Sequence, residues 1–109
     1  MAVLKKISAI LPTEKLKNVE RRLRKIGVGK VTAIQSKGFG EYKSFLRSGW
    51  PMPHVRIDIY CASEGAENIA KTVIVEAHTG SAGGGIVAIQ PVIQLYRIRS
   101  KGEALEGEI

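Results

Sequence analysis

Apolar and polar side chains alternate along residues 55–60, and a weaker two-residue pattern, with apolar residues on both faces, runs along residues 3–10 and 31–36. Alternation of this kind predicts half-buried β-strands, because successive side chains of a strand point to opposite faces of a sheet. A fourth stretch, residues 86–89, is apolar throughout and predicts another strand, which we expect Pro91 to interrupt. We expect the chain after it, residues 92–99, to be extended as well.

Two other stretches repeat apolar residues at every third or fourth position, which predicts amphipathic helices. The first is expected to begin with Thr13 as its N-cap and to end at Gly27, with an apolar stripe formed by Leu16, Val19, Leu23 and Ile26. The second is expected to begin with Ser63 as its cap and to end at Gly80, with a stripe formed by Ile69, Val73 and Ala77. Lysines and arginines lie between the apolar residues of the first helix, so its other face is expected to meet water.

The predicted order of elements is that of a ferredoxin-like α+β fold (βαββαβ), an antiparallel sheet with two helices on one face. We expect one domain over residues 1–100 and a polar C-terminal tail over residues 101–109. Two helices on one side leave the other sheet face bare, and self-association is the simplest way to cover it. The connection over residues 37–54 far exceeds a usual hairpin loop, so we expect it to be functional.

The composition adds a positive charge and few groups suited to catalysis. The 109 residues carry a formal net charge of +7, which favours nucleotides, nucleic acids or small anions as partners. His54, His78 and Cys61 form no nucleophile–base pair and no metal-ligand spacing, so we expect neither an enzyme nor a metal site. No stretch reads as a signal peptide or a membrane span, and we expect a cytoplasmic location.

The sequence Lys37-Gly38-Phe39-Gly40 opens the long loop. Its glycines let the backbone turn sharply and approach a ligand, although a glycine-rich loop entrance without a ligand explains them equally well. The same residues begin an RNA-recognition signature, but Glu41 and Ser44 then stand where base-stacking aromatic residues are needed. RNA recognition by this route is therefore not expected.

A second glycine-rich segment, residues 79–85, follows the second predicted helix. Successive glycines expose backbone N–H groups that can converge on phosphate oxygens. The alternative is a helix C-cap followed by a flexible connector. Three consecutive glycines, Gly83, Gly84 and Gly85, exceed what a cap requires and favour an anion site.

Arg97 and Arg99 lie two residues apart in the last extended stretch. On an extended backbone their guanidinium groups would point to one side, where they can hold a phosphate or a carboxylate by paired hydrogen bonds. An edge strand protected by its charges is an equally good explanation of this pair.

These three segments, in this order, resemble the nitrogen-regulatory PII family. Lys37–Gly40 resembles the entrance to the family's T-loop, and Pro53–Asp58 resembles the exit from it into the third strand. Residues 80–85 resemble the B-loop, and Tyr96–Ser100 resembles the C-terminal signature. The resemblance implies a homotrimer that binds adenine nucleotides between its subunits and reports the bound ligand to a regulated protein partner through its T-loops.

The resemblance also implies which residues bind the nucleotide. The T-loop entrance and the B-loop would line the cleft through Gly38, Phe39, Gly40, Gly83, Gly84 and Gly85. Adenine and ribose would be surrounded by Thr32, Asp58 and Tyr60. The phosphates would be reached from a neighbouring subunit by Arg97 and Arg99.

The chain departs from the family at positions that would contact phosphates. Glu41 and Tyr42 stand where the family has arginine and glutamine, and Ile86 stands where it has a phosphate-binding lysine. Because lost cations weaken binding most for the most highly charged ligand, we expect ADP or AMP to bind at least as well as ATP. His54 replaces a lysine associated with 2-oxoglutarate, so magnesium-dependent binding of 2-oxoglutarate is expected to be weak or absent.

The shortened T-loop, with only the twelve residues 41–52 between Gly40 and Pro53, is similar to that of divergent PII-like proteins linked to inorganic carbon. These include carboxysome-associated forms that respond to bicarbonate, a planar anion to which Arg47 and His54 could donate hydrogen bonds. We therefore expect a sensor of ADP or AMP, and of bicarbonate, that regulates a partner in inorganic-carbon metabolism. A nitrogen sensor of ATP, ADP and 2-oxoglutarate, a basic nucleic-acid-binding domain and a small trimeric enzyme are the alternatives.

Overall fold

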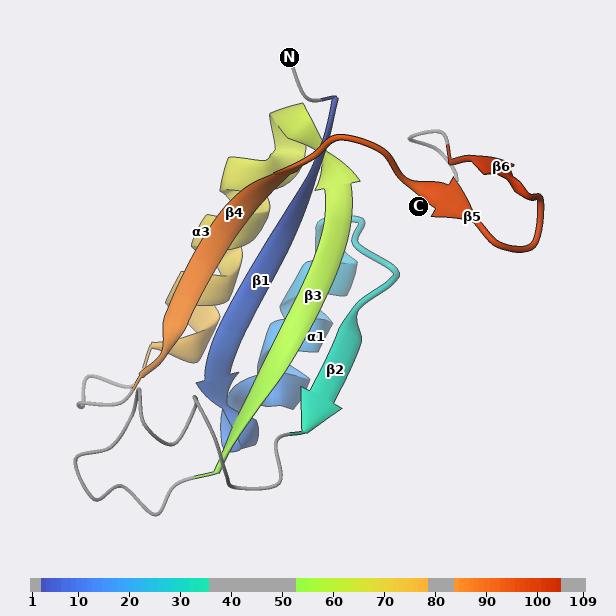
Figure 1. Ribbon diagram of the computed structural model, residues 1–109. Helices are drawn as coiled ribbons and strands as arrows, with labels where there is room; N and C mark the ends of the chain where they lie inside the picture. Colours follow the sequence, from blue (N-terminus) through green and yellow to red (C-terminus); the bar gives the residue numbers. More distant parts are fainter. Residues whose placement is uncertain (1–2, 36–52, 79–83, 105–109) are drawn as a thin grey trace.

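The computed structural model describes residues 3–35, 53–78 and 84–104 (Figure 1). The strands of the main sheet are β1 (Leu4–Pro12), β2 (Thr32–Gln35), β3 (His54–Ala62) and β4 (Ile86–Val92). The described residues form the helices α1 (Leu16–Lys25) and α3 (Ala66–Ala77), and each is preceded by a single 3-10 turn, η1 (Thr13–Lys15) or η2 (Ser63–Gly65). Two short strands follow β4, namely β5 (Tyr96–Arg97) and β6 (Gly102–Glu103).

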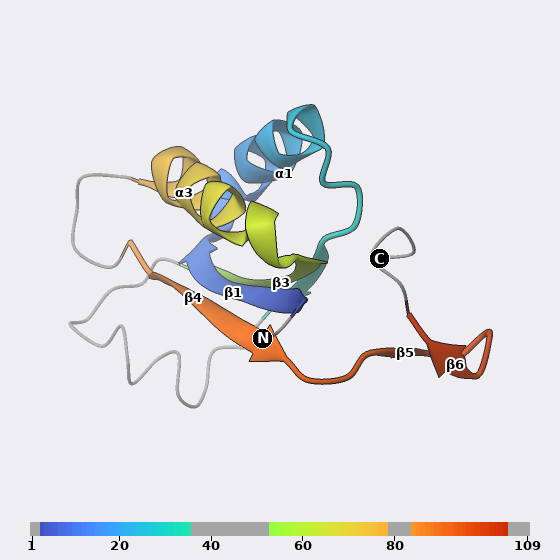
Figure 2. The same cartoon turned by 90° about the horizontal axis from the view of Figure 1, so that it is seen from above.

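The main sheet has the strand order β2-β3-β1-β4, and every neighbouring pair is antiparallel. Figure 2 shows α1 and α3 side by side on one face of this sheet. The predicted ferredoxin-like βαββαβ arrangement is therefore confirmed. Within the described ranges, no helix combines the length and the apolar character that crossing a membrane requires.

The core lies between the helices and the face of the sheet that they cover. The register places the apolar residues of β1 opposite those of β3, as in the pairs Ile7–Ile59, Ala9–Ile57 and Leu11–Val55. All six side chains are at most 2% exposed. The predicted helix stripes supply the other half of the core through the buried side chains of Val19, Leu23, Ile69, Val73 and Ala77. We call this side of the sheet the covered face.

The ends of the helices differ in how well the sequence predicted them. Gly27 has φ +95°, and the N–H groups of Gly27 and Val28 donate to the carbonyls of Arg24 and Leu23, which forms the expected left-handed C-terminal cap. The predicted N-caps are wrong. Thr13 and Ser63 lie inside η1 and η2, and the residues before α1 and α3 make no capping hydrogen bond through a side chain.

Two prolines lie inside strands, which corrects the prediction that Pro91 interrupts the fourth strand. β4 continues through Pro91, whose register partner is Lys5 of β1. Because β4 is at the edge of the sheet, a residue without an N–H can be accommodated there. Pro12 is likewise the last residue of β1, paired with His54.

The last described residues form a hairpin arm, residues 93–104, that projects from the sheet (Figures 1 and 2). Tyr96 and Arg97 pair with Glu103 and Gly102, so the extended stretch expected over residues 92–99 ends in a turn. The turn closes with Lys101 at φ +60°, its N–H donating to the Arg97 carbonyl. The boundary expected at residue 100 therefore falls within this hairpin.

Candidate ligand site on the open sheet face

No helix of the described residues lies on the other side of the sheet, and we call that side the open face. Alternation and register place four residues in one row across it, Ala88 of β4, Ser8 of β1, Asp58 of β3 and Thr32 of β2. Tyr60 lies on the same side, two residues beyond Asp58. The structure thus brings together on one face the three residues expected around adenine and ribose, namely Thr32, Asp58 and Tyr60.

Asp58 is the centre of a polar cluster on the open face. Its Oδ1 accepts a hydrogen bond of 2.8 Å from the Ser8 hydroxyl, and its Oδ2 lies 3.4 Å from Nη2 of Arg56. The Asp58 side chain is only 15% exposed, so the carboxylate is held in one position by partners on two strands. A fixed carboxylate can accept hydrogen bonds from the hydroxyl groups of a sugar.

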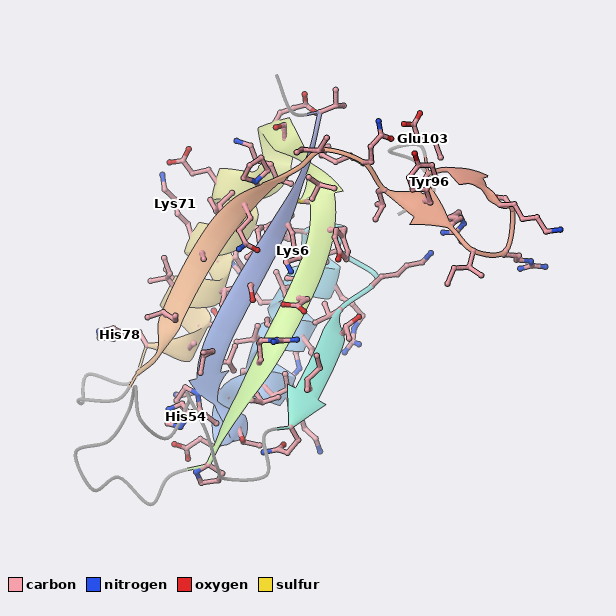
Figure 3. All side chains as sticks on the ribbon, viewed as in Figure 1. Lys6, His54, Lys71, His78, Tyr96 and Glu103 are labelled. Carbon is pink, nitrogen blue, oxygen red and sulfur yellow. The ribbon has the colours of Figure 1, made fainter. Side chains whose placement is uncertain are left out.

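Tyr60 lines a cleft of about 460 Å³ on the open face, where β4 leads into the hairpin arm. The tyrosine ring is 41% exposed. Lys6, on the neighbouring strand and also lining this cleft, brings a positive charge to it (Figure 3). The other lining residues are Gln90, Pro91, Val92, Gln94 and Leu95. We call this space the tyrosine cleft; it offers an aromatic surface, an ammonium group and two amides.

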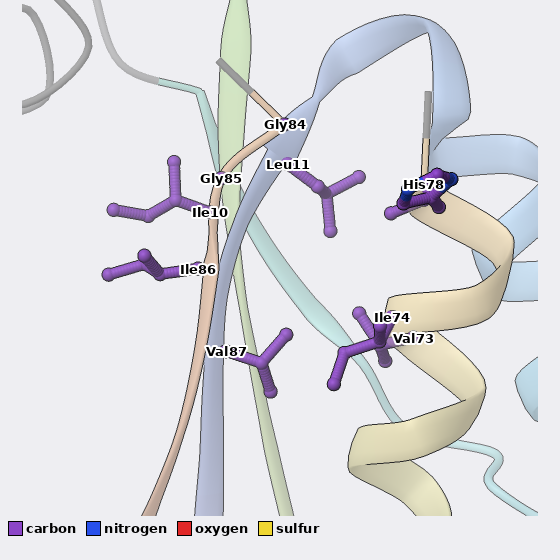
Figure 4. A pocket seen from close by; sticks show the side chains of 10 residues that line it. Ile10, Leu11, Val73, Ile74, His78, Gly84, Gly85, Ile86 and Val87 are labelled. Carbon is purple, nitrogen blue, oxygen red and sulfur yellow. The ribbon is translucent and has the colours of Figure 1, made fainter. Parts of the chain in front are cut away.

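A second cleft, of about 500 Å³, lies between the start of β4 and the end of α3 (Figure 4). We call it the glycine cleft because Gly84 and Gly85 form one end of it. Its other walls are largely apolar and consist of Ile10, Leu11, Val73, Ile74, Ala77, His78, Ile86 and Val87. None of the residues lining this cleft is a lysine or an arginine, so its described wall offers no fixed cation to a phosphate.

Gly85 is required by the backbone itself. Its φ is +105°, and a Cβ at this position would overlap the carbonyl oxygen of Ile10 on the neighbouring strand. A glycine is therefore needed where the chain enters β4, whatever ligand is bound. The run of glycines predicted an anion site here. The structure adds a second, steric reason for a glycine at this position, namely the closeness of the Ile10 carbonyl.

His54 was expected in the long loop but is the first residue of β3. It is paired with Pro12 and is 9% exposed. The Gln35 side chain ties this end of β3 to β2 by donating to the His54 carbonyl at 3.3 Å and to the Thr13 hydroxyl at 3.4 Å. The loop expected over residues 37–54 therefore ends before His54.

Arg97 and Arg99 lie on the hairpin arm, Arg97 in β5 and Arg99 in the turn that follows. The sequence predicted that both arginines would lie on one extended strand, and this prediction is wrong. Figure 3 labels Tyr96 and Glu103 on this arm and His78 beside the glycine cleft, and the two regions lie at opposite ends of the molecule. Within one chain, the arm arginines are therefore far from the glycine cleft.

The expected site residues that lie on the sheet thus form two groups, toward its opposite edges. Gly84 and Gly85 lie at the β4 edge, whereas Thr32 lies at the β2 edge and Asp58 on the strand beside it. The whole width of β1 separates β4 from β3. Gly38, Phe39, Gly40, Arg47 and Gly83 lie outside the described residues.

Cys61 is on the covered face at the end of β3 and is 9% exposed. Burial raises the pKa of its thiol above the ordinary value of 9.0, and the charge of Lys5 opposes this in part. The thiol is therefore neutral and packed near neutral pH, as expected for a core residue. Nowhere in residues 3–35, 53–78 and 84–104 do three His, Cys, Asp or Glu side chains gather as metal ligands would.

Ser8 and Arg56 hold the Asp58 carboxylate, yet sequence analysis did not single them out. The available signal was alternation, because Ser8 shares a face of β1 with Lys6, and Arg56 shares a face of β3 with Asp58 and Tyr60. Which faces meet depends on the register between β1 and β3, and alternation within each strand does not determine it.

Comparison with known proteins gives results that agree with this geometry. Residues 4–102 match the family model described as nitrogen regulatory protein P-II. The chain is 31% identical over 111 residues to a nitrogen regulatory protein P-II of Rhizobium meliloti (strain 1021), covering 95% of this chain and 99% of the relative. It is 32% identical to one of Azospirillum brasilense, covering 89% and 93%. In fold it is similar to Arabidopsis thaliana PII bound to citrate, with a TM-score of 0.78 and 24% identity over 99% of this chain and 94% of that one.

Proposed function

Because this chain belongs to the nitrogen regulatory protein P-II family, we propose that it is a signalling protein that binds ADP or AMP between its subunits and regulates a protein partner. The partner would be contacted by the shortened T-loop, which begins at Lys37 and ends before His54. The protein acts by binding, not by catalysis, in the cytoplasm. The proposal is supported by the family match together with the arrangement of the candidate residues on the sheet.

The division of the site between two sheet edges supports binding between copies of the chain. If the β4 edge of one copy lies beside the β2 edge of the next, Gly84 and Gly85 approach the Thr32 and Asp58 of the neighbour. A head-to-tail contact of this kind closes into a ring when its rotation permits, and we propose a homotrimer. The ring would also cover the open face, whose side chains include Tyr60 and Ile86, respectively 41% and 44% exposed. In it, Arg97 and Arg99 would reach the phosphates bound by a neighbour.

The observation that carries the nucleotide preference is the apolar wall of the glycine cleft. Ile86 stands beside Gly85, where a cation would contact a terminal phosphate, and the described residues that line this cleft include no lysine or arginine. Each missing cation weakens the binding of a triphosphate more than the binding of a diphosphate, because the electrostatic attraction grows with the charge of the ligand. ADP and AMP would therefore bind at least as well as ATP.

A second ligand would report a metabolic state. We propose bicarbonate, held by Arg47 and His54, and a role in inorganic-carbon metabolism that includes association with carboxysomes. The names of the relatives favour a second candidate, nitrogen regulation through ATP, ADP and 2-oxoglutarate. The two functions predict different responses to the second ligand.

Calorimetric titration with AMP, ADP and ATP, each alone and with bicarbonate or with magnesium and 2-oxoglutarate, separates these functions. Tight binding of ADP or AMP that bicarbonate strengthens supports the carbon-linked sensor. Tight ATP binding only with magnesium and 2-oxoglutarate identifies a nitrogen sensor instead. If no nucleotide binds, the assignment of the cleft is wrong.

The variant Ile86→Lys tests the charge argument directly. A lysine here would add a cation beside Gly85, on the side of β4 that faces away from α3 (Figure 4), and we expect it to raise ATP affinity by roughly tenfold or more relative to AMP, the scale of one charge-assisted hydrogen bond. Val75→Lys is the matched control, because it adds the same charge at an exposed position of α3. Equal effects of the two variants would show that net charge, not the cleft, sets the preference.

A further inference from the structure

The positive charge of the chain is concentrated on one element that the proposed sensor does not use. Residues 14–30, which include α1, contain seven lysines and arginines and only two glutamates, a net charge of +5 out of +7 for the whole chain. The nucleotide and the partner are assigned above to the sheet, the loops and the arm. The charge of α1 is therefore unexplained by the proposed function.

The cations of α1 are arranged on one side of the helix. Val19 and Leu23 are buried against the sheet, and with 3.6 residues per turn the opposite side carries Lys17, Arg21, Arg24 and Lys25. All four side chains are exposed. We call these four residues the basic face.

The basic face is open to an external anion. Arg21 donates to the Asn18 side-chain oxygen at 3.3 Å, and in residues 3–35, 53–78 and 84–104 no member of the basic face forms an ion pair. Adjacent residues of the face are one helical turn or less apart, so their charges act on the same ligand. Figure 2 shows α1 in the layer remote from the open sheet face, so a ring that covers the open face leaves the basic face accessible.

We propose that the basic face binds the phosphate backbone of double-stranded nucleic acid without sequence preference. A ten-residue helix is about 15 Å long, and a duplex carries one negative charge per about 1.7 Å of its axis, so four cations meet several phosphates at once. Guanidinium groups, which supply two of the four cations, bind phosphate oxygens in pairs. Contacts with phosphates alone position a protein but read no sequence.

Other polyanions fit the basic face less well. Single-stranded nucleic acid is bound through aromatic side chains that stack on bases, and the basic face has none. A helix that lies in a lipid surface directs its apolar side to the lipid, whereas Val19 and Leu23 are buried in the core. Specific protein interfaces centre on buried apolar or aromatic anchors, which this face also lacks.

Fluorescence anisotropy of a labelled DNA duplex of mixed sequence, titrated with the full chain, tests this inference. With four phosphate contacts the logarithm of the affinity should fall with the logarithm of the salt concentration with a slope of about −3.6. Between about 50 and 200 mM salt the affinity would fall by about two orders of magnitude. No binding at the lower concentration would overturn the proposal.

Two double variants that remove the same charge show whether α1 is responsible. Arg21→Gln with Arg24→Gln should reduce the salt slope by about 2, because each phosphate contact contributes about one unit. Lys71→Gln with Lys101→Gln, on α3 and on the arm, should leave the slope unchanged. Glutamine is as good a helix former as arginine, and circular dichroism checks the fold.

Three further results would overturn the proposal. Equal salt slopes for the two double variants would show that binding depends on the overall charge of the chain and not on α1. Tighter binding of a single strand than of the duplex would indicate stacking at another site. Binding to vesicles of phosphatidylserine and phosphatidylcholine without binding to the duplex would identify a lipid surface as the partner. None of these results depends on whether the protein binds ADP.

Discussion

The two faces of the main sheet are built from alternate residues of the same strands, yet they differ in almost every property. On the covered face, Ile7, Ile57 and Ile59 are at most 1% exposed, and the residues around them are apolar. On the open face, Ser8, Arg56 and Asp58 form a polar cluster. The covered face accounts for the stability of one chain. The open face offers groups for a ligand and for other copies of the chain.

The largest expected effect comes from making one substitution on both faces. Ile57→Ala leaves a cavity in the core and should lower the free energy of unfolding by about 3 kcal/mol. Ile34→Ala on the open face, where the isoleucine is 39% exposed, should cost less than about 1 kcal/mol when the chain is monomeric. Urea unfolding at low protein concentration measures both values. An equal loss of unfolding free energy in the two variants would mean that the covered face does not contribute more to stability than the open face.

Ile34→Ala should have its effect on assembly. Because the proposed ring buries the β2 edge and the open face, Ile34→Ala should weaken the association of the trimer. Ile57→Ala should lower the stability of each chain but leave the surface between the chains unchanged. Sedimentation equilibrium compares the two. An unchanged trimer for Ile34→Ala would place the contact between copies elsewhere.

The next effect concerns the point where the chain enters β4. Gly85→Ala places a side chain at φ +105° and against the Ile10 carbonyl, and it should cost at least about 2 kcal/mol of stability. Gly29→Ala is the control, because nothing lies within 4 Å of an added Cβ there and its φ is not positive. Thermal unfolding measures both variants. An unchanged melting temperature for Gly85→Ala would mean that the backbone at the start of β4 does not have this conformation.

A third prediction separates ligand binding from folding on the open face. Asp58→Ala removes a carboxylate held by Ser8 and Arg56, and it should weaken ADP binding by about tenfold to a hundredfold, since hydrogen bonds to charged groups contribute about 1.5–3 kcal/mol. Stability should change by only about 1 kcal/mol, because the cluster is partly exposed. Calorimetry and urea unfolding provide the two numbers. Glu67→Ala, which removes an exposed carboxylate of α3, should change neither.

The smallest expected effect is the pH dependence of Cys61. Burial raises the pKa of the thiol in the folded protein above 9.0, so the folded state holds this proton more tightly than the unfolded state. Its contribution to stability is therefore complete below pH 9.0 and is lost as the pH rises through the folded pKa. Urea unfolding between about pH 8 and 10.5 should show a steeper loss of stability for the natural protein than for Cys61→Val. Identical slopes would show that the thiolate is tolerated in the core.

The covered face was predicted well from the sequence because it depends on local periodicity. The helix stripes and the alternation in the third strand identified most of the core residues on those elements, and Gly27 ended α1 as expected. Ile26, expected in the first stripe, is 39% exposed. Pro91 was misjudged because a proline is tolerated only at a sheet edge, and strand order is a property of the whole fold. The hairpin arm was missed because its turn closes on Lys101, without the glycine or asparagine that usually marks a left-handed position.

The open face was predicted only in part, because its site depends on register. Alternation correctly put Asp58 and Tyr60 on one side of β3, and the pairing of β2 with β3 added Thr32. The role of Ser8 follows from its position opposite Asp58, which no single strand reveals. Gly85 was assigned to a ligand from its run of consecutive glycines, and that role stays a prediction. The carbonyl of Ile10 gives a separate reason why a glycine is needed.

Each nucleotide site is proposed to be shared by two copies of the chain, and mixing two damaged chains tests this sharing. Asp58→Ala damages one half of the site, and Ile86→Glu damages the other half by placing a negative charge beside Gly85. We expect each variant alone to bind ADP at least about tenfold more weakly than the natural protein.

After the two variants are unfolded and refolded together, about a quarter of the boundaries in a random ring join two undamaged halves. Calorimetry of the mixture should therefore recover ADP sites with near-natural affinity, at roughly a quarter of the natural number. If the mixture binds ADP no better than either variant alone, the site lies within one chain and the account is wrong.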